Sequence, residues 1–270
     1  MSQRIIRLLI AYDGGRYQGW QRQKSAPTIQ GTIEQVLGRI TQQPVSLIGA
    51  GRTDAGVHAW GQVAHFHSLS RLSPEKIQEA LNGLLSKDIL IREVREAEPD
   101  FHARYSCVSK VYDYYLWNKP VLPPFVRSYL WPVPGLLDCD LVRQGLNLLQ
   151  GEHDFSSFQS QGSQVAHPVR ILFQASLSIV PWGALRIRFR ANGFLRHMVR
   201  NMVGSLIQLG RQKTSLEGFA GILEARDRCR AGEMAPARGL FLRKAIYGIR
   251  DSGYGMHDKD RRSEIISRTF

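Results

Sequence analysis

The chain has 270 residues, of which 43% are hydrophobic, 22% charged and 9% aromatic. These figures exclude global disorder and a collagen-like chain, and the length indicates two domains or one large composite sheet. No stretch approaches the roughly 20 apolar residues that span a bilayer, and Met1 leads into a strand-like segment without a cleavable apolar region. We therefore expect a cytoplasmic protein with no membrane segment.

The cysteines and the net charge limit which kinds of site and ligand the protein can have. Cys107, Cys139 and Cys229 lie far apart and form no CxxC pair, which argues against a disulfide framework and a thiolate zinc site. The net charge is +13, and such a field attracts phosphates. Residues 1–105 carry a net +3, residues 106–250 carry +10, and residues 251–270 are balanced.

The basic excess is densest in residues 155–216, which contain no acidic residue. The eight cations there are Arg170, Arg186, Arg188, Arg190, Arg196, Arg200, Arg211 and Lys213. A solvated basic face is one interpretation of this pattern. A surface that binds a polyanion explains the complete lack of acids better.

In the first half, residues 4–11 predict a buried strand, and the turn residues at 12–15 end it. A helix is predicted after Thr28, its N-cap, and another after Ser73, where a serine cap, a proline and an early acid coincide. Residues 45–67 indicate a strand, a glycine-rich loop and a strand, and residues 88–94 a further strand. The order is β-α-β-β-α-β.

The second half repeats these elements with larger insertions. The predicted elements are strands at 108–117, 170–180, 185–190 and 240–247 and helices at 141–149, 194–209 and 216–225. Asn192 is the expected N-cap of the helix at 194–209, and Gly210 is its expected end.

The fold class predicted from these elements is α+β, with two pseudo-repeated subdomains that share a largely antiparallel or mixed central sheet with flanking helices. The expected domains are residues 1–105 and the strongly basic residues 106–250, and residues 251–270 are expected to form a flexible tail.

The glycine-rich loop at residues 49–59 carries the densest chemical signal. Three glycines within eight residues let a backbone approach a ligand closely or adopt positive φ. A tight turn explains the glycines, but it does not explain why Arg52 and Asp54 stand among small residues on the same loop.

This loop resembles the signature GRTDxGVHA of the TruA family of tRNA pseudouridine synthases, matched by residues 51–59. The other matching motifs are YDGxxYxGWQ at 12–21, TIQGTIE at 28–34, FHAR at 101–104, KxYxY at 110–114, GxHDFSSF at 151–158, HMVRNMVGSL at 197–206 and GLFL at 239–242. Two departures are slight: His-Pro-Val precedes Arg170, and Trp117 replaces a tyrosine. Neither lies in the signature loop.

The resemblance implies a pseudouridine synthase fold and the isomerisation of uridine to pseudouridine at nucleotides 38, 39 and 40 of tRNA, in the anticodon stem-loop. It also implies a homodimer that needs neither a metal nor an organic cofactor. Breaking and remaking the glycosidic bond requires one carboxylate, a cage for the detached uracil and exclusion of water. Asp54 occupies the family's catalytic position, as nucleophile in an acylal path or as base in a glycal path, and the sequence does not choose between them.

The resemblance also implies roles for other residues. Tyr112 matches the active-site tyrosine that stacks on uracil, although a strand tyrosine alone is more often core. Arg200 matches an arginine that pairs with the catalytic carboxylate; its alternative is a solvent-facing charge. Arg52 would hold phosphates or form a surface ion pair, and Leu240 would form an apolar wall of the base pocket.

The strand at 185–190 and the segment after it carry further arginines that are expected to bind RNA. Arg186, Arg188 and Arg190 alternate with apolar residues, so period-two geometry puts them on one face of a strand. Of these, Arg188 and Arg190 are predicted to contact tRNA together with Arg196 on the following segment.

Other classes of function remain open at this stage. His65 and His67 flank Phe66, but no third ligand stands nearby, so no metal site is predicted. A basic RNA-binding module without catalysis is the main alternative, and the combination of Asp54, Tyr112 and Arg200 speaks against it. A glycosidase or nuclease would need two carboxylates or a metal cluster, and the sequence shows neither pattern.

Overall fold

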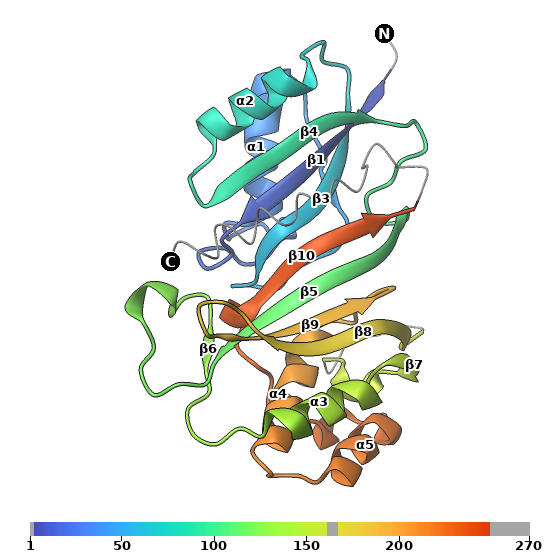
Figure 1. Ribbon diagram of the computed structural model, residues 1–270. Coiled ribbons are helices and arrows are strands. Elements are labelled where there is room, and N and C mark those ends of the chain that lie inside the picture. The colour runs from blue at the N-terminus through green and yellow to red at the C-terminus, as the bar shows by residue number, and fades with distance from the viewer. Residues whose placement is uncertain (1–2, 161–166, 249–270) are drawn as a thin grey trace. The chain divides into compact units, whose positions relative to one another are not determined.

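The computed structural model describes residues 3–160 and 167–248, which form ten strands and five α-helices (Figure 1). They divide into two compact units. The first holds Met1–Lys110 and Phe241–Ile246, and the second holds Val111–Leu240. Each unit combines strands with helices, which confirms the predicted α+β class. The tail predicted at residues 251–270 lies outside the described residues.

The first unit has the predicted β-α-β-β-α-β order. Its elements are β1 (Arg4–Tyr12), α1 (Ile29–Thr41), β2 (Ile48–Gly49), β3 (His58–Ser68), α2 (Pro74–Leu84) and β4 (Ile89–Ala97). Both predicted N-caps are confirmed: the Thr28 side chain accepts from Gly31 N–H and the Ser73 side chain from Lys76 N–H. Helix α2 packs on β4 and contacts α1.

The strands of the first unit follow the order β4-β1-β3-β10. β1 pairs antiparallel with β3 and β4, and β10 (Leu240–Tyr247) joins β3 in parallel. The register pairs Arg7 with His65 on β3 and with Arg95 on β4, so these three side chains share one face of the sheet. The neighbouring Ile6 and Leu8 are fully buried on the opposite face.

The second unit contains a sheet and a cluster of helices. Its elements are β5 (Cys107–Trp117), which begins in the first unit, β6 (Trp131–Pro132), α3 (Cys139–Leu148), β7 (Gly151–Asp154), β8 (Val169–Ile179), β9 (Leu185–Ala191), α4 (Met198–Gly210) and α5 (Leu216–Ala225). The strands follow the order β5-β9-β8-β7, with β8 antiparallel to β7 and β9. Helix α3 contacts α4, α5 and β8.

The predicted start of α4 is wrong. The helix begins at Met198, four residues beyond the predicted Phe194, and Asn192 is not its N-cap. The side chain of Asn192 instead accepts from the backbone N–H of Ile171 on β8. The N-cap is His197, which adopts a left-handed conformation with φ of 64°. The Asn192 side-chain oxygen, which the local sequence predicts as the helix cap, therefore bonds to a neighbouring strand instead.

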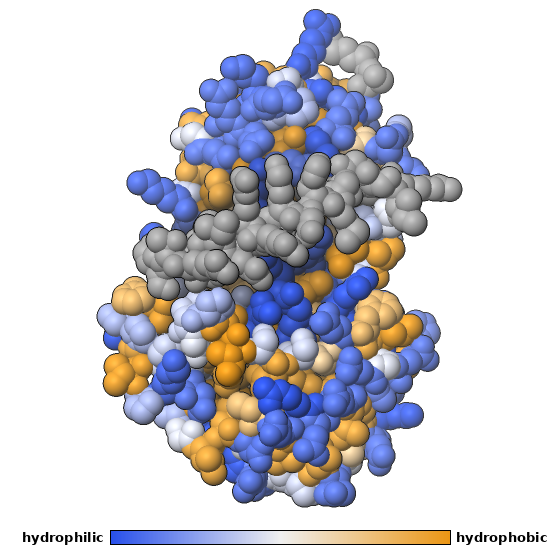
Figure 2. Space-filling model, in the orientation of Figure 1, coloured by the Kyte–Doolittle hydropathy of each residue, from blue (hydrophilic) through white to orange (hydrophobic). Residues whose placement is uncertain are grey.

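The surface of the second unit carries apolar as well as polar side chains (Figure 2). The most exposed large hydrophobic residues there are Val121, Phe125 and Leu136, each more than three-quarters exposed. None of the described helices is long and apolar enough to cross a membrane.

Helix α4 lies unusually close to the segment that precedes β10. A Cβ atom at Gly204 would lie 1.7 Å from the carbonyl oxygen of Glu233, a distance that no structure tolerates. Only glycine therefore lets residues 233–235 run against this helix, where Ala235 N–H donates to the carbonyl of Arg200.

We predict that Gly204→Ala lowers the free energy of unfolding by about 1–3 kcal/mol, because a backbone segment must shift to admit the methyl group. Urea unfolding measures the change. The matched control is Gly221→Ala in α5, where no atom lies within 4 Å of the added methyl; it should raise stability by about 0.5–1 kcal/mol through helix propensity. Equal stability of the two variants would contradict the close approach.

Candidate active site

The loop that carries Asp54 connects β2 to β3 and is fixed by its own turn and by the strand beyond it. Val57 N–H donates to the carbonyl of Asp54 at 3.2 Å, and Gly56 between them has φ of +76°. Gln62 Nε2 on β3 donates to the carbonyl of Gly51 at 2.8 Å. The main chain on both sides of Asp54 is therefore held in place.

Thr53 anchors the loop to the preceding part of the chain. Its carbonyl accepts from Trp20 N–H at 3.0 Å, and its Oγ1 lies 2.8 Å from the buried Tyr12 hydroxyl in a hydrogen bond. Burial raises the pKa of Tyr12, which keeps this phenol protonated as a partner for Thr53. Two aromatic residues of the YDGxxYxGWQ motif thus hold the residue next to Asp54.

Two glycines of the same motif let the chain pass directly under the loop. A Cβ at Gly14 would lie 1.9 Å from the Val57 carbonyl oxygen, and one at Gly19 would lie 2.5 Å from the Thr53 carbonyl oxygen. Gly19 also has φ of +84°. The sequence predicted Gly14 only as part of the turn that ends the first strand and gave Gly19 no role beyond its place in the motif.

The two charged residues of the loop differ in exposure. Asp54 is half-buried, whereas Arg52 is exposed. Lys110 adds a further cation beside the loop, because a Cβ at Gly51 would lie 3.2 Å from its Cε. A half-buried carboxylate on a rigid loop with cations nearby is suited to act on a bound anionic substrate.

Tyr112 and Arg200 belong to the second unit. Tyr112 on β5 is 7% exposed, and its ring meets Phe194 edge to face with centroids 5.0 Å apart. Arg200 on α4 donates from Nε to the Ala235 carbonyl at 2.7 Å. This bond fixes one edge of the guanidinium group, so Arg200 is not a loosely solvated surface charge.

The neighbour of Arg200 is Tyr114, which is fully buried and donates from its hydroxyl to the Pro236 carbonyl at 2.7 Å. Burial raises the pKa of Tyr114, and the positive charge of Arg200 opposes the shift. A Cβ at Gly239 would lie 2.7 Å from the Tyr114 ring, so this glycine admits the ring beside Leu240. Leu240 itself is 5% exposed.

The arginines of β9 alternate with buried residues, as predicted from the sequence. Arg188 is committed to a bidentate ion pair: its Nε and NH2 groups each lie 2.7 Å from an oxygen of Asp113. The Asp113 side chain is 1% exposed. Arg190 is exposed and lies 5.6 Å from the Phe173 ring centroid. Arg196 is exposed before α4.

The histidines of β3 have structural partners. His58 Nδ1 accepts from Gly14 N–H at 3.1 Å, and His65 Nδ1 accepts from Ala103 N–H at 3.1 Å. Burial, followed by the charges of two neighbouring histidines, lowers the pKa of His65 to about 4. Among the described residues, no three His, Cys, Asp or Glu side chains are arranged to hold a metal ion.

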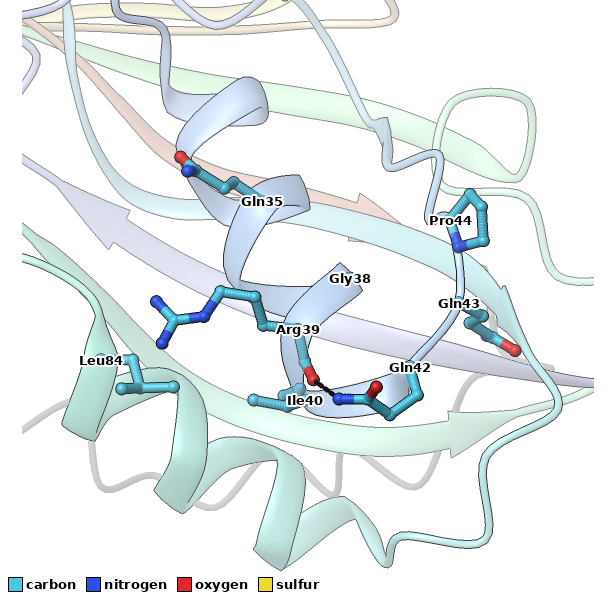
Figure 3. Close-up of a pocket in the computed structure, with 8 residues that line it drawn as sticks. All are labelled: Gln35, Gly38, Arg39, Ile40, Gln42, Gln43, Pro44 and Leu84. Carbon is cyan, nitrogen blue, oxygen red and sulfur yellow. Dashed lines mark hydrogen bonds between the residues drawn. The ribbon is translucent and has the colours of Figure 1, made fainter.

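One surface groove lies away from these residues, at the end of α1 (Figure 3). It is lined by Gln35, Gly38, Arg39, Ile40, Gln42, Gln43, Pro44 and Leu84. Among these residues, Gln42 Nε2 donates to the Arg39 carbonyl at 2.6 Å (Figure 3). The lining contains one cation and no carboxylate, and none of the residues predicted to form the active site belongs to it.

Known proteins resemble the chain over most of its length. A family model described as tRNA pseudouridine synthase matches residues 8–106 and 146–248. The tRNA pseudouridine synthase A 1 of Desulfotalea psychrophila is 44% identical over 250 residues, which cover 90% of this chain and 100% of that protein. The tRNA pseudouridine synthase A 1 of Protochlamydia amoebophila is 42% identical over 89% of this chain and 95% of its own length.

The tRNA pseudouridine synthase A of Maridesulfovibrio salexigens is also 42% identical, over 90% of both chains. The family match includes the Asp54 loop. Its first segment stops at residue 106, next to the strand that carries Tyr112, and the relatives align over nearly their full lengths. The chain belongs to the tRNA pseudouridine synthase family.

Proposed function

We propose that this chain converts uridine to pseudouridine at nucleotides 38, 39 and 40 of the tRNA anticodon stem-loop, with Asp54 as the catalytic carboxylate. The observation that carries the proposal is the rigid loop on which a half-buried Asp54 stands, inside the segment that the family model matches. The names of the relatives support tRNA as the substrate.

The reaction needs few groups. The glycosidic bond between C1′ and N1 breaks with its electron pair left on N1, the detached uracil turns, and C1′ bonds to C5. C5 then loses its proton and N1 takes one up, so the product is an isomer of the substrate. Asp54 acts on the sugar or on the base, and a fixed carboxylate meets this need without reorganisation at the moment of reaction. The target nucleotide must first leave the stack, and its phosphates are the proposed ligands of Arg52.

Three residues of the second unit complete the proposed machinery. Tyr112 stacks on the uracil, Leu240 supplies an apolar wall, and Arg200 pairs with the catalytic carboxylate. The bond from Arg200 Nε to the Ala235 carbonyl supports the last role, because it restricts how the guanidinium plane turns. Tyr112 and Leu240 are 7% and 5% exposed, so both side chains lie where water is largely excluded.

The remaining parts of the proposal concern partners and location. The chain works in the cytoplasm as a homodimer and uses no metal or organic cofactor. The chemistry of the site residues supports the last point, since one carboxylate suffices for the isomerisation. Arg190 and Arg196 are exposed and are the proposed contacts to the tRNA backbone, and the acid-free sequence around them supports this assignment. Arg188, which the sequence grouped with them, pairs with Asp113 instead.

The two β9 arginines should behave differently when replaced. Arg190→Gln should leave the free energy of unfolding within about 0.5 kcal/mol and lower the slope of log Kd for tRNA against log salt by about one. Arg188→Gln strands the buried Asp113 carboxylate and should cost about 3–5 kcal/mol of stability. Urea unfolding and binding at several salt concentrations measure both effects. An unchanged slope for Arg190→Gln removes it from the RNA surface.

Arg200→Lys tests the proposed pairing with the carboxylate. Lysine keeps the charge but lacks the planar fork, so tRNA affinity should stay within a few-fold while turnover falls on the order of 100-fold or more. Single-turnover rates at saturating tRNA, measured beside the dissociation constant, separate the two. Turnover near that of the unchanged enzyme would show that a point charge at this position is enough.

Asp54→Asn is the decisive variant. It removes one negative charge and leaves the glycines and every basic residue in place, so folding and tRNA binding should persist. Loss of a nucleophile in other enzymes costs on the order of four to six decades in rate. Tritium release from C5-labelled uridine in whole tRNA, followed by mapping of the modified nucleotides, measures the loss and the positions.

The matched control is Asp140→Asn, which removes the same charge from the first turn of α3, where the side chain is 85% exposed. It should release tritium at the normal rate. Substantial tritium release by Asp54→Asn would show that Asp54 only shapes the loop. Normal tRNA binding without any tritium release by the unchanged protein would favour an RNA-binding module, and pseudouridine outside nucleotides 38–40 would contradict the proposed positions.

A further inference from the structure

The turn between β4 and β5 presents an aromatic ring to solvent. The Tyr105 side chain is 79% exposed, although Phe101 and Ala103 of the same turn are buried. Ser106 N–H donates to the His102 carbonyl at 2.9 Å, which closes the turn beneath the ring. The closed turn therefore holds the Tyr105 ring in a position where it meets solvent.

His102 holds Tyr105 in place. Its Nδ1 accepts from the backbone N–H groups of Arg104 and Tyr105 at 3.2 and 3.1 Å. The two rings are stacked, with centroids 4.3 Å apart and planes at 25°. One face of Tyr105 is thus supported by a ring that is itself fixed by the main chain, and most of the side chain still meets solvent.

A buried layer supports His102 in turn. His65 on β3 contacts the ring of His102 edge to face at 4.9 Å and accepts from Ala103 N–H. The guanidinium carbon of Arg7 lies 5.2 Å from the Phe101 ring centroid, and Phe101 meets His65. The orientation of the turn is therefore set by the sheet, and little conformational freedom is lost when a ligand stacks on it.

A cation accompanies the exposed ring. Arg104 is exposed, and its guanidinium carbon lies 5.8 Å from the centroid of Tyr105. An aromatic face for a base beside a guanidinium group for a phosphate is the combination by which proteins hold unpaired nucleotides.

The turn lies far from Asp54 along the first unit. His65 is seven residues beyond His58 on β3, so these two residues are about 23 Å apart at roughly 3.3 Å per residue. A mononucleotide does not reach from one end to the other. A ligand that uses both must be a macromolecular RNA.

We propose that Tyr105 and Arg104 form a second RNA-binding site, at which an unpaired nucleobase stacks on Tyr105 and the adjoining phosphate meets Arg104. This inference rests on the proposed function, because it takes tRNA as the RNA. The site positions the substrate and does not touch the reacting atoms, so it should act on tRNA affinity and KM and leave the rate of the bound complex unchanged.

The test compares three variants of Tyr105. Tyr105→Ala should raise the dissociation constant for a tRNA transcript about 5- to 100-fold, the range expected for the loss of one stacked base. Tyr105→Phe and Tyr105→Trp keep a ring and should bind within about twofold of the unchanged protein. The rate at saturating tRNA should be the same in all of them. The control is Phe125→Ala, which removes a ring that is 77% exposed in the second unit.

The outcomes separate this site from the proposed function. Normal pseudouridine formation with equal Kd and KM for Tyr105→Ala overturns the stacking site alone. A loss of affinity in Tyr105→Phe equal to that in Tyr105→Ala also overturns it, because the hydroxyl would then be responsible. If the unchanged protein binds tRNA but forms no pseudouridine, the proposed function fails, and the tRNA dissociation constants of the same variants still test the stacking site. Arg104→Gln should lower the salt slope by about one.

Discussion

The close passage of residues 14–19 beneath the Asp54 loop is the constraint on which the first unit depends. Any side chain at Gly14 or Gly19 would occupy the place of a loop carbonyl. Because both backbones are at contact distance, the loop cannot move without moving the start of α1, and the hydrogen bond from Trp20 N–H to the Thr53 carbonyl ties the two together. This packing fixes the main chain that carries Asp54.

The second unit uses the same device. Gly204 admits residues 233–235 to the surface of α4, and Gly239 admits the ring of Tyr114. In both units a proposed site residue stands next to a glycine contact: Asp54 next to the loop contacts, Arg200 next to the Ala235 carbonyl. Preorganisation of this kind lowers the cost of holding charged groups in fixed positions before the substrate arrives.

Features set by neighbouring residues are predictable from the sequence, and features set by distant partners are not. Thr28 and Ser73 cap their helices as expected, because each cap bonds three residues away. Asn192 has the same chemistry but bonds to Ile171 across two strands. The alternation of β9 predicts the face of Arg188 correctly, yet its partner Asp113 lies 75 residues away.

The same distinction applies to the charge pattern. Residues 155–216 contain no acid, but β5 supplies the carboxylate of Asp113 to an arginine in the middle of them. A basic run in sequence is therefore not a uniformly basic surface in space. The motif resemblance identified the Asp54 loop because its glycines, arginine and aspartate are contiguous, whereas the role of residues 12–20 became visible only through their contacts.

Histidines of the first unit act as hydrogen-bond acceptors for backbone N–H groups. His65 and His102 both accept backbone N–H groups of the turn that carries Tyr105 through Nδ1. An imidazole accepts at Nδ1 only when that nitrogen is unprotonated. Burial keeps His65 neutral by lowering its pKa to about 4. These contacts hold the turn that carries Tyr105 against β3.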